Sequence, residues 1–76
     1  MIDVRLYAYL PAASKRGLAE FQVDARPGLT VGDVLDEAGI PVDAVSIIMI
    51  DGAHADLDSA LSDNDRLALF PAVSGG

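Results

Sequence analysis

One amphipathic helix with a clear start and a clear end is the feature that most constrains the fold of this chain. Thr30 can cap its first turn, and Asp33 stands three residues later as a short version of the capping-box acid. Apolar residues then recur with the i, i+3, i+4, i+7 spacing of one buried helix face: Val31, Val34, Leu35 and Ala38. Gly39 can end the helix in a left-handed conformation, and Pro41 prevents its continuation. An isolated stripe of this kind needs a sheet to pack against.

Two strand patterns precede the helix. From Ile2 to Leu10 apolar residues occupy every second position, with polar residues and tyrosines between them, as in a half-buried strand. The stretch 11–17 reads as a loop because it opens with a proline and ends with a glycine. A second strand is predicted around Leu18 to Ala25, with Phe21 and Val23 on one face. A loop of this length between neighbouring strands favours an antiparallel hairpin.

Further strand patterns follow the helix. Residues 45–50 form an apolar run of strand length, and Asp51-Gly52 after it is a tight-turn signal. The segment 53–61 is mixed and predicts a short strand and a helical turn. Residues 66–70 form a final strand with two leucines facing inward. The predicted order is β-β-α-β-(β)-β, an α+β fold in which one main helix covers a mixed sheet, with a domain over residues 1–70 and a flexible tail over 71–76.

The composition excludes several classes of function. The net charge is −7, and the five cations are scattered, which argues against binding nucleic acid. No apolar run approaches the ~18 residues of a membrane helix, and the N-terminus lacks a signal-peptide pattern. The chain has no cysteine, so it offers no disulfide, thiolate metal site or thiol nucleophile. We therefore expect a cytoplasmic protein that binds neither nucleic acid nor membrane.

An acidic stretch in the second half of the chain suggests a metal site, but its spacing does not fit one. The residues concerned are Asp51, His54, Asp56, Asp58, Asp63 and Asp65. Ala60 stands where a calcium loop needs a third ligand, and no glycine follows it. The chain also lacks a nucleophile elbow and is too small for a walled substrate pocket. We expect no bound metal or cofactor and no enzyme of the hydrolase type.

The last six residues, 71–76, form no recognisable element and end in Gly75-Gly76. Extended, they reach roughly 20 Å beyond the last strand, at ~3.3–3.6 Å per residue. Glycines lack a Cβ, so such a tail can thread a narrow channel and present its carboxylate to an enzyme. Termini are often small and without function, so the glycine pair is informative only in combination with the strand and helix order before it.

In that combination the chain resembles the MoaD/ThiS group of ubiquitin-like sulfur carriers, and within it the MoaD branch, the small subunits of molybdopterin synthase. The resemblance covers essentially the whole chain. It is carried by residues 4–8, 30–35 and 49–52 and most specifically by the ending Asp65 to Gly76. Two departures lie in the tail: Ala72 replaces a proline that is often found after the aromatic residue, and Ser74 stands where alanine is common.

The resemblance implies a ubiquitin-like β-grasp fold and chemistry that is carried out by partners. An E1-like enzyme would use ATP to join AMP to the Gly76 carboxylate. A sulfur donor would then displace AMP and leave a thiocarboxylate, with Gly75 as the spacer. A large subunit of molybdopterin synthase would accept the tail, and the sulfur would enter the dithiolene of a pterin precursor of the molybdenum or tungsten cofactor. The chain would supply no catalytic side chain of its own.

Partner binding is expected at the root of the tail and on the face of the sheet that points away from the helix. If Ile48 and Ile50 face the helix, then the opposite face carries Tyr7, Ile47, Met49 and Phe70. Outward apolar clusters on small acidic proteins are often partner sites, although apolar residues scattered singly need no such explanation. We expect Phe70, Pro71, Val73 and Ser74 to contact a partner along with the tail.

Three other functions remain open. The same tail chemistry could serve a thiazole synthase in thiamin biosynthesis or another sulfur-dependent pathway. The chain could be a protein modifier joined to target lysines through Gly76. Lys15 is its only lysine, which weakens chain building but permits single attachment. It could also be a pure interaction module that makes no use of its tail.

Overall fold

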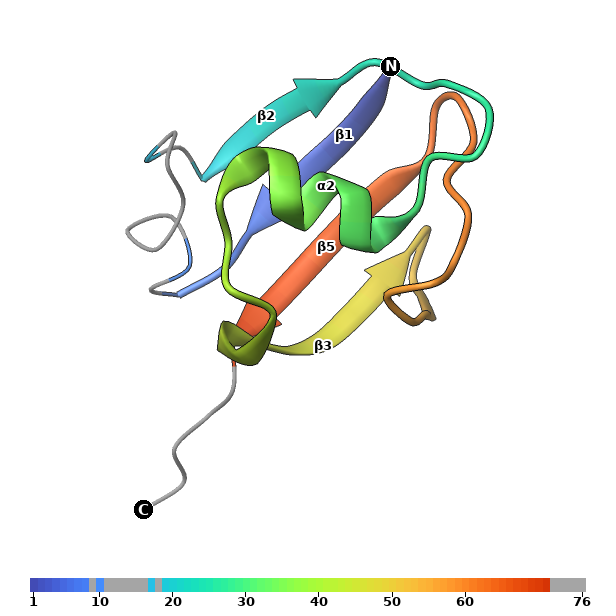
Figure 1. The fold of residues 1–76 in the computed structure, drawn as a ribbon. Helices are drawn as coiled ribbons and strands as arrows, with labels where there is room; N and C mark the ends of the chain where they lie inside the picture. The colour runs from blue at the N-terminus through green and yellow to red at the C-terminus, as the bar shows by residue number, and fades with distance from the viewer. Residues whose placement is uncertain (9, 11–16, 18, 72–76) are drawn as a thin grey trace.

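A computed structural model describes residues 1–8, 10, 17 and 19–71 of the 76-residue chain. The described residues include a five-stranded sheet and the helix α2 (Figure 1). The elements, in chain order, are β1 (Ile2–Leu6), β2 (Glu20–Val23), α2 (Val31–Ala38), the short 3₁₀ helix η1 (Val42–Ala44), β3 (Val45–Ile50), β4 (Ala53–His54) and β5 (Arg66–Pro71).

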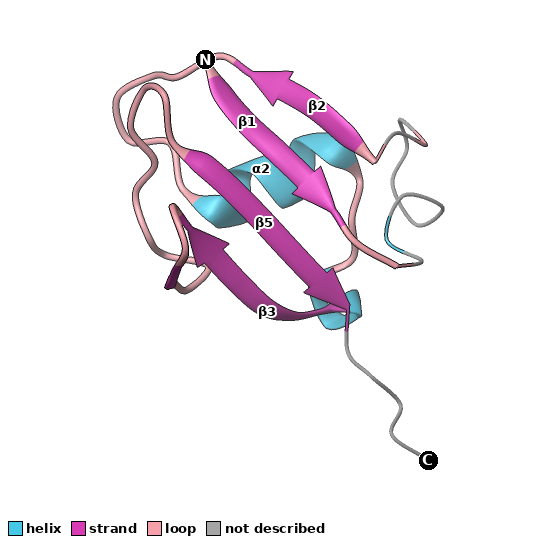
Figure 2. Ribbon diagram, turned by 180° about the vertical axis from the view of Figure 1, so that it is seen from behind, coloured by secondary structure: helices cyan, strands magenta, loops and turns pink. Residues whose placement is uncertain are grey.

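The sheet is mixed, as predicted, and its strand order is β2-β1-β5-β3-β4. The β1 strand pairs antiparallel with β2 and parallel with β5, and β3 pairs antiparallel with both β5 and β4. The last strand of the chain therefore lies in the middle of the sheet. Helix α2 lies across one face, and no helix of the described ranges covers the opposite face (Figures 1 and 2).

The core lies between α2 and the sheet. On β1, β2 and β5 the buried positions alternate with outward ones, because successive side chains of a strand point to opposite faces. The fully buried large side chains are Ile2, Val4, Leu10, Leu29, Val31, Val34, Leu35, Leu67 and Leu69. The predicted inward positions of Phe21, Val23 and the two leucines of β5 are confirmed.

Helix α2 begins and ends where the sequence predicts. The Thr30 hydroxyl accepts a hydrogen bond from the backbone N–H of Asp33 at 3.3 Å, and the Asp33 carboxylate accepts one from the backbone N–H of Thr30 at 3.0 Å. This is a complete capping box. Gly39 ends the helix with a φ of 71°, a left-handed conformation that a glycine adopts without steric cost.

The rest of the helix N-terminus is satisfied by the segment that precedes β5. The N–H of Val31 donates to the carbonyl of Ser59 at 3.1 Å, and that of Gly32 donates to the carbonyl of Leu57 at 2.9 Å. The first N–H groups of a helix otherwise have no intrahelical partner and can bind anions. Here backbone carbonyls of the same chain accept these hydrogen bonds, so this end of α2 is held to the segment before β5.

The capping box makes stability depend on pH. Hydrogen bonds with Thr30 lower the pKa of Asp33 below its ordinary value, and the bond from the Thr30 backbone N–H has the largest effect. A folded-state pKa below the unfolded one contributes stability above the unfolded pKa, and this contribution is lost as the pH falls through the folded pKa. We expect Thr30→Ala, which removes the capping hydroxyl, to cost about 1 kcal/mol at pH 7. We expect Asp33→Asn, which removes the titrating carboxylate, to flatten the acid side of the stability profile.

Urea unfolding between neutral and acid pH measures both effects. Thr30→Ser keeps the capping oxygen and should unfold like the wild type. An unchanged acid slope in Asp33→Asn would show that the capping box does not govern the acid loss of stability.

Two features of the first half differ from the prediction. The first strand ends at Leu6 instead of continuing to Leu10, because Ala8 has a φ of 55° and the N–H of Leu10 turns back to the carbonyl of Tyr7 at 3.2 Å. Leu10 is still fully buried, so its side chain belongs to the core although the residue lies beyond the end of β1. The second strand covers residues 20–23 only, which is shorter than the predicted range. Tyr9 and Leu18 lie outside the described residues.

Three features of the second half also differ. The segment 53–61 contains the short strand β4 and turns, so the predicted helical turn there is wrong. The 3₁₀ helix η1 before β3 was not predicted. Strand β5 extends one residue further than expected, to Pro71, which is buried and pairs with Val45. Within the described ranges, no helix has the length and hydropathy that crossing a membrane requires.

Candidate functional site

The sheet face opposite α2, here called the outer face, is turned toward the viewer in Figure 2. It carries the side chains that β1, β3 and β5 direct away from the core. Register decides which of them become neighbours. Ile47 pairs with Phe70 and Met49 pairs with Ala68 across β3 and β5. Tyr7 follows the end of β1, and its N–H donates to the carbonyl of Leu69 at 3.1 Å, which holds it beside β5. We call Tyr7, Ile47, Met49 and Phe70 the outer patch.

A β-bulge in β3 sets the composition of this patch. The pairing with β5 shifts between Val45 and Ile47, which leaves Ser46 as an extra residue. Strict alternation would place Val45 and Ile48 on opposite faces, yet both pack against the core. The bulge thus keeps Ile48 inward and directs Ile47 to the outer face, where it is 42% exposed.

The two aromatic rings of the outer patch are stacked. The ring centroids of Tyr7 and Phe70 are 4.5 Å apart, and the ring planes differ by 10°. Such pairs contribute about 0.5–1.5 kcal/mol beyond the apolar area they bury, so the rings hold each other in position. Tyr7 remains 40% exposed. The stack forms a preorganised apolar surface on the strand that leads into the tail.

The structure brings together some of the predicted partner-binding residues and not others. Tyr7, Ile47, Met49 and Phe70 share the outer face, as the alternation predicted. Pro71 is buried and pairs with Val45, so it takes no part in the outer patch. The remaining predicted site residues lie outside the described residues: Val73, Ser74, Gly75 and Gly76.

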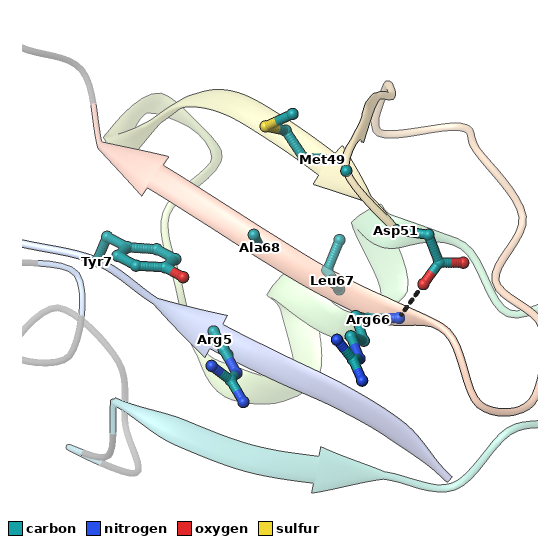
Figure 3. A pocket seen from close by; sticks show the side chains of 8 residues that line it. Arg5, Tyr7, Met49, Asp51, Arg66, Leu67 and Ala68 are labelled. Carbon is teal, nitrogen blue, oxygen red and sulfur yellow. Dashed lines mark hydrogen bonds between the residues drawn. The ribbon is translucent and has the colours of Figure 1, made fainter.

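The sequence did not reveal a pocket of about 470 Å³ on the outer face, beside the patch (Figure 3). Arg5 of β1 and Arg66 of β5 line it together with Tyr7, Met49 and Ala68. Asp51 lies at its edge, where its carboxylate accepts a hydrogen bond from the backbone N–H of Arg66 at 2.9 Å. The five cations look scattered in the sequence, and the parallel pairing of β1 with β5 brings two of them to one pocket.

The described cations differ in how well they are neutralised. Arg26 lies 2.6 Å from Glu37, and this hydrogen bond raises the pKa of Arg26. Arg5 reaches Glu20 only at 3.9 Å, with both side chains at least half exposed. In the described part of the chain, no ion pair involves Arg66, and no three His, Cys, Asp or Glu side chains lie close enough together to hold a metal ion. The outer face therefore offers apolar contact area and positive charge, which suits binding.

Comparison with known proteins supports the predicted family and fold. The sequence model of the ThiS family matches residues 4–76. The crystal structure of SAMP1 from Haloferax volcanii is similar at 31% identity, covering 99% of this chain and 98% of that one, with a TM-score of 0.73. Curated protein sequences give no significant match.

Two further solved structures are similar over nearly their full length. A putative molybdopterin converting factor subunit 1 from Pyrococcus furiosus has 20% identity, covers 95% of this chain and 97% of its own, and has a TM-score of 0.72. A complex of subunits 1 and 2 of the molybdopterin-converting factor from Helicobacter pylori matches at 25% identity, 99% and 97% coverage, and a TM-score of 0.62. The ubiquitin-like β-grasp fold expected from the sequence is confirmed.

Proposed function

The chain belongs to the ThiS family of MoaD/ThiS-type sulfur carriers, and on this basis we propose that it carries sulfur as a thiocarboxylate on Gly76. The observation that carries the proposal is the extent of the family match, which runs to residue 76 and so includes Gly75-Gly76. An E1-like enzyme joins the Gly76 carboxylate to the α-phosphorus of ATP, and pyrophosphate leaves. A sulfur donor then attacks the carbonyl carbon, and AMP leaves with the C–O bonding electrons.

In this proposal the chain contributes its terminal carboxylate and its docking surface, while the partners contribute the catalytic groups. The outer patch supports this division because it offers rigid apolar area on the strand from which the tail continues. Aromatic residues and Met are enriched in the cores of protein interfaces. ATP is bound by the activating enzyme and not by this chain, and the whole cycle takes place in the cytoplasm.

For the sulfur acceptor we propose the large subunit of molybdopterin synthase, where the sulfur enters the dithiolene of the pterin. The similarity to the Helicobacter pylori protein supports this choice, because that structure is a complex of subunits 1 and 2 of the molybdopterin-converting factor. A thiazole synthase is the alternative acceptor, and the chemistry at Gly76 would be the same.

A second candidate function is protein modification. It is favoured by the similarity to SAMP1, described as small archaeal modifier protein 1, at 31% identity. In that case the activated Gly76 carbonyl is attacked by a lysine amine of a target, which forms an amide bond. Lys15 is the chain's only lysine, so attachment of single copies fits better than long chains.

Mass spectrometry of the tail tests the sulfur chemistry. The protein is incubated with its cognate E1-like enzyme, ATP and a sulfide source, and then digested with trypsin. Cleavage after Arg66 releases residues 67–76, a peptide that contains no methionine, so oxidation of Met1 or Met49 cannot imitate the signal. We expect this peptide to gain the mass of an oxygen-to-sulfur exchange, and to gain nothing when ATP is left out.

The same digest separates the two candidates. Modification of other proteins would leave residues 67–76 as a branch on target lysines, because trypsin has no site between Arg66 and Gly76. A cognate activating enzyme that yields neither adenylate nor thiocarboxylate on the tail peptide would refute the carrier function.

A further inference from the structure

The outer face carries positive charge that the chain itself leaves poorly neutralised. The protein has twelve carboxylate residues and only five lysines and arginines, so a cation without an ion-pair partner is unexpected. The carboxylate of Asp51 also lines the pocket, but it accepts a hydrogen bond from the backbone N–H of Arg66 at 2.9 Å and not from its guanidinium. Asp3 stands opposite Arg66 in the β1–β5 register, but its carboxylate accepts a hydrogen bond from Gln22 at 3.3 Å. No ion pair to Arg66 is found among the described residues, and Arg5 has only the 3.9 Å contact with Glu20.

The two arginines belong to one recess. In the parallel register Arg5 pairs with Ala68, the second residue after Arg66 on β5, so the arginines are diagonal neighbours on the outer face. Figure 3 shows both side chains beside the pocket that Tyr7 and Met49 border on its other sides. Its volume of about 470 Å³ lies in the range of roughly 300–1,000 Å³ typical of ligand pockets, so it can admit a side chain from outside.

We propose that this pocket receives an aspartate or glutamate side chain of the activating enzyme when the enzyme docks on the outer patch. The inference rests on the proposed function, which supplies that partner. Guanidinium groups hold carboxylates through paired, charge-assisted hydrogen bonds, and Arg5 and Arg66 would grip the carboxylate from β1 and β5. The contact fixes the position of the enzyme along the sheet relative to the strand that leads into the tail.

A protein side chain fits the surroundings better than a small anion does. The pocket is continuous with the outer patch, since Tyr7 and Met49 belong to both. A small anion would leave the stacked rings and Ile47 uncovered, whereas a docked protein buries them and excludes water from the ion pair. Charge complementarity at the border of an apolar contact also raises the association rate and fixes register.

The experiment measures the dissociation constant for the cognate E1-like enzyme by calorimetry at low salt. Arg5→Gln and Arg66→Gln are compared with Arg26→Gln, which makes the same change in net charge at a cation already paired with Glu37. We expect about tenfold weaker binding for each outer-face variant and less than about twofold for the control. Thermal unfolding checks that all three variants are folded.

A charge swap identifies the partner group. Arg66→Glu should abolish binding at low salt, and replacing the matching acidic residue of the enzyme by arginine should restore it. If Arg5→Gln and Arg66→Gln bind like Arg26→Gln while the wild type is adenylated, the inference is overturned and the proposed function stands. If the enzyme neither binds nor adenylates the wild type, both the proposed function and the inference about the pocket are refuted.

A third outcome assigns the pocket to a small anion. Inorganic phosphate is titrated into the protein alone and the arginine side-chain signals are followed by NMR. Saturable shifts that disappear in Arg66→Gln, together with unchanged enzyme binding, would overturn the protein side chain as the occupant.

Discussion

Leu69→Ala is expected to lower the free energy of unfolding by about 2–5 kcal/mol. Leu69 is fully buried in β5, and its register partners are Leu6 on β1 and Ile48 on β3. Truncation leaves a cavity in the middle of the sheet, where three strands limit how far the neighbours can close it. Small domains have only about 5–15 kcal/mol in total, so a large part of the stability would be lost. Urea unfolding at neutral pH measures the difference.

Ile47→Ala is the matched control, because it truncates an apolar side chain on the neighbouring strand that faces outward. We expect a change within about 0.5 kcal/mol, since Ile47 is 42% exposed. A similar cost at Leu69 and Ile47 would mean that the outer face contributes to the core, contrary to the packing described above.

Gly76 deletion and Gly75→Val are expected to abolish thiocarboxylate formation and leave unfolding unchanged. Deletion moves the carboxylate out of reach of the adenylating site, and a branched side chain obstructs a channel that glycines can thread. The reaction is followed on the tryptic tail peptide, and stability is followed by urea unfolding.

Ser74→Ala serves as the tail control, because alanine is common at this position in the proteins the chain resembles, and it should react like the wild type. Sulfur incorporation by the Gly76 deletion would refute the assignment of the chemistry to the terminal carboxylate. Together with the core variants, these changes separate folding from reactivity.

The elements that could be predicted are those whose signals are local. The signals of helix α2 lie within ten consecutive residues: the capping box at Thr30 and Asp33, the apolar face, and the C-terminal Gly39. Each of these patterns is compatible with only one kind of local structure. Alternation likewise predicted which residues of β1 and β5 point inward. It also predicted that Tyr7 and Phe70 share the outer face, although their stacking depends on the pairing of β1 with β5.

The features that escaped prediction depend on conformation or on distant pairing. Ala8 has no unusual side chain, so its left-handed conformation and the early end of β1 leave no mark in the sequence. The bulge at Ser46 likewise has no signal in the sequence pattern of β3. Arg5 and Arg66 are sixty-one positions apart, and only the parallel pairing of their strands makes them neighbours. The pocket on the outer face could therefore be found only in three dimensions.

The position of β5 also has a consequence for how the chain is made. A ribosome that has synthesised residues 1–65 has produced β1 with β2, and β3 with β4, but not the strand that joins the two pairs. Contacts between distant segments form slowly, because closing a long loop costs conformational entropy before the new contacts stabilise the chain. The sheet can be completed only after the final strand is made. Folding of the whole sheet therefore requires that β5 has been made and is free to pair with both β1 and β3.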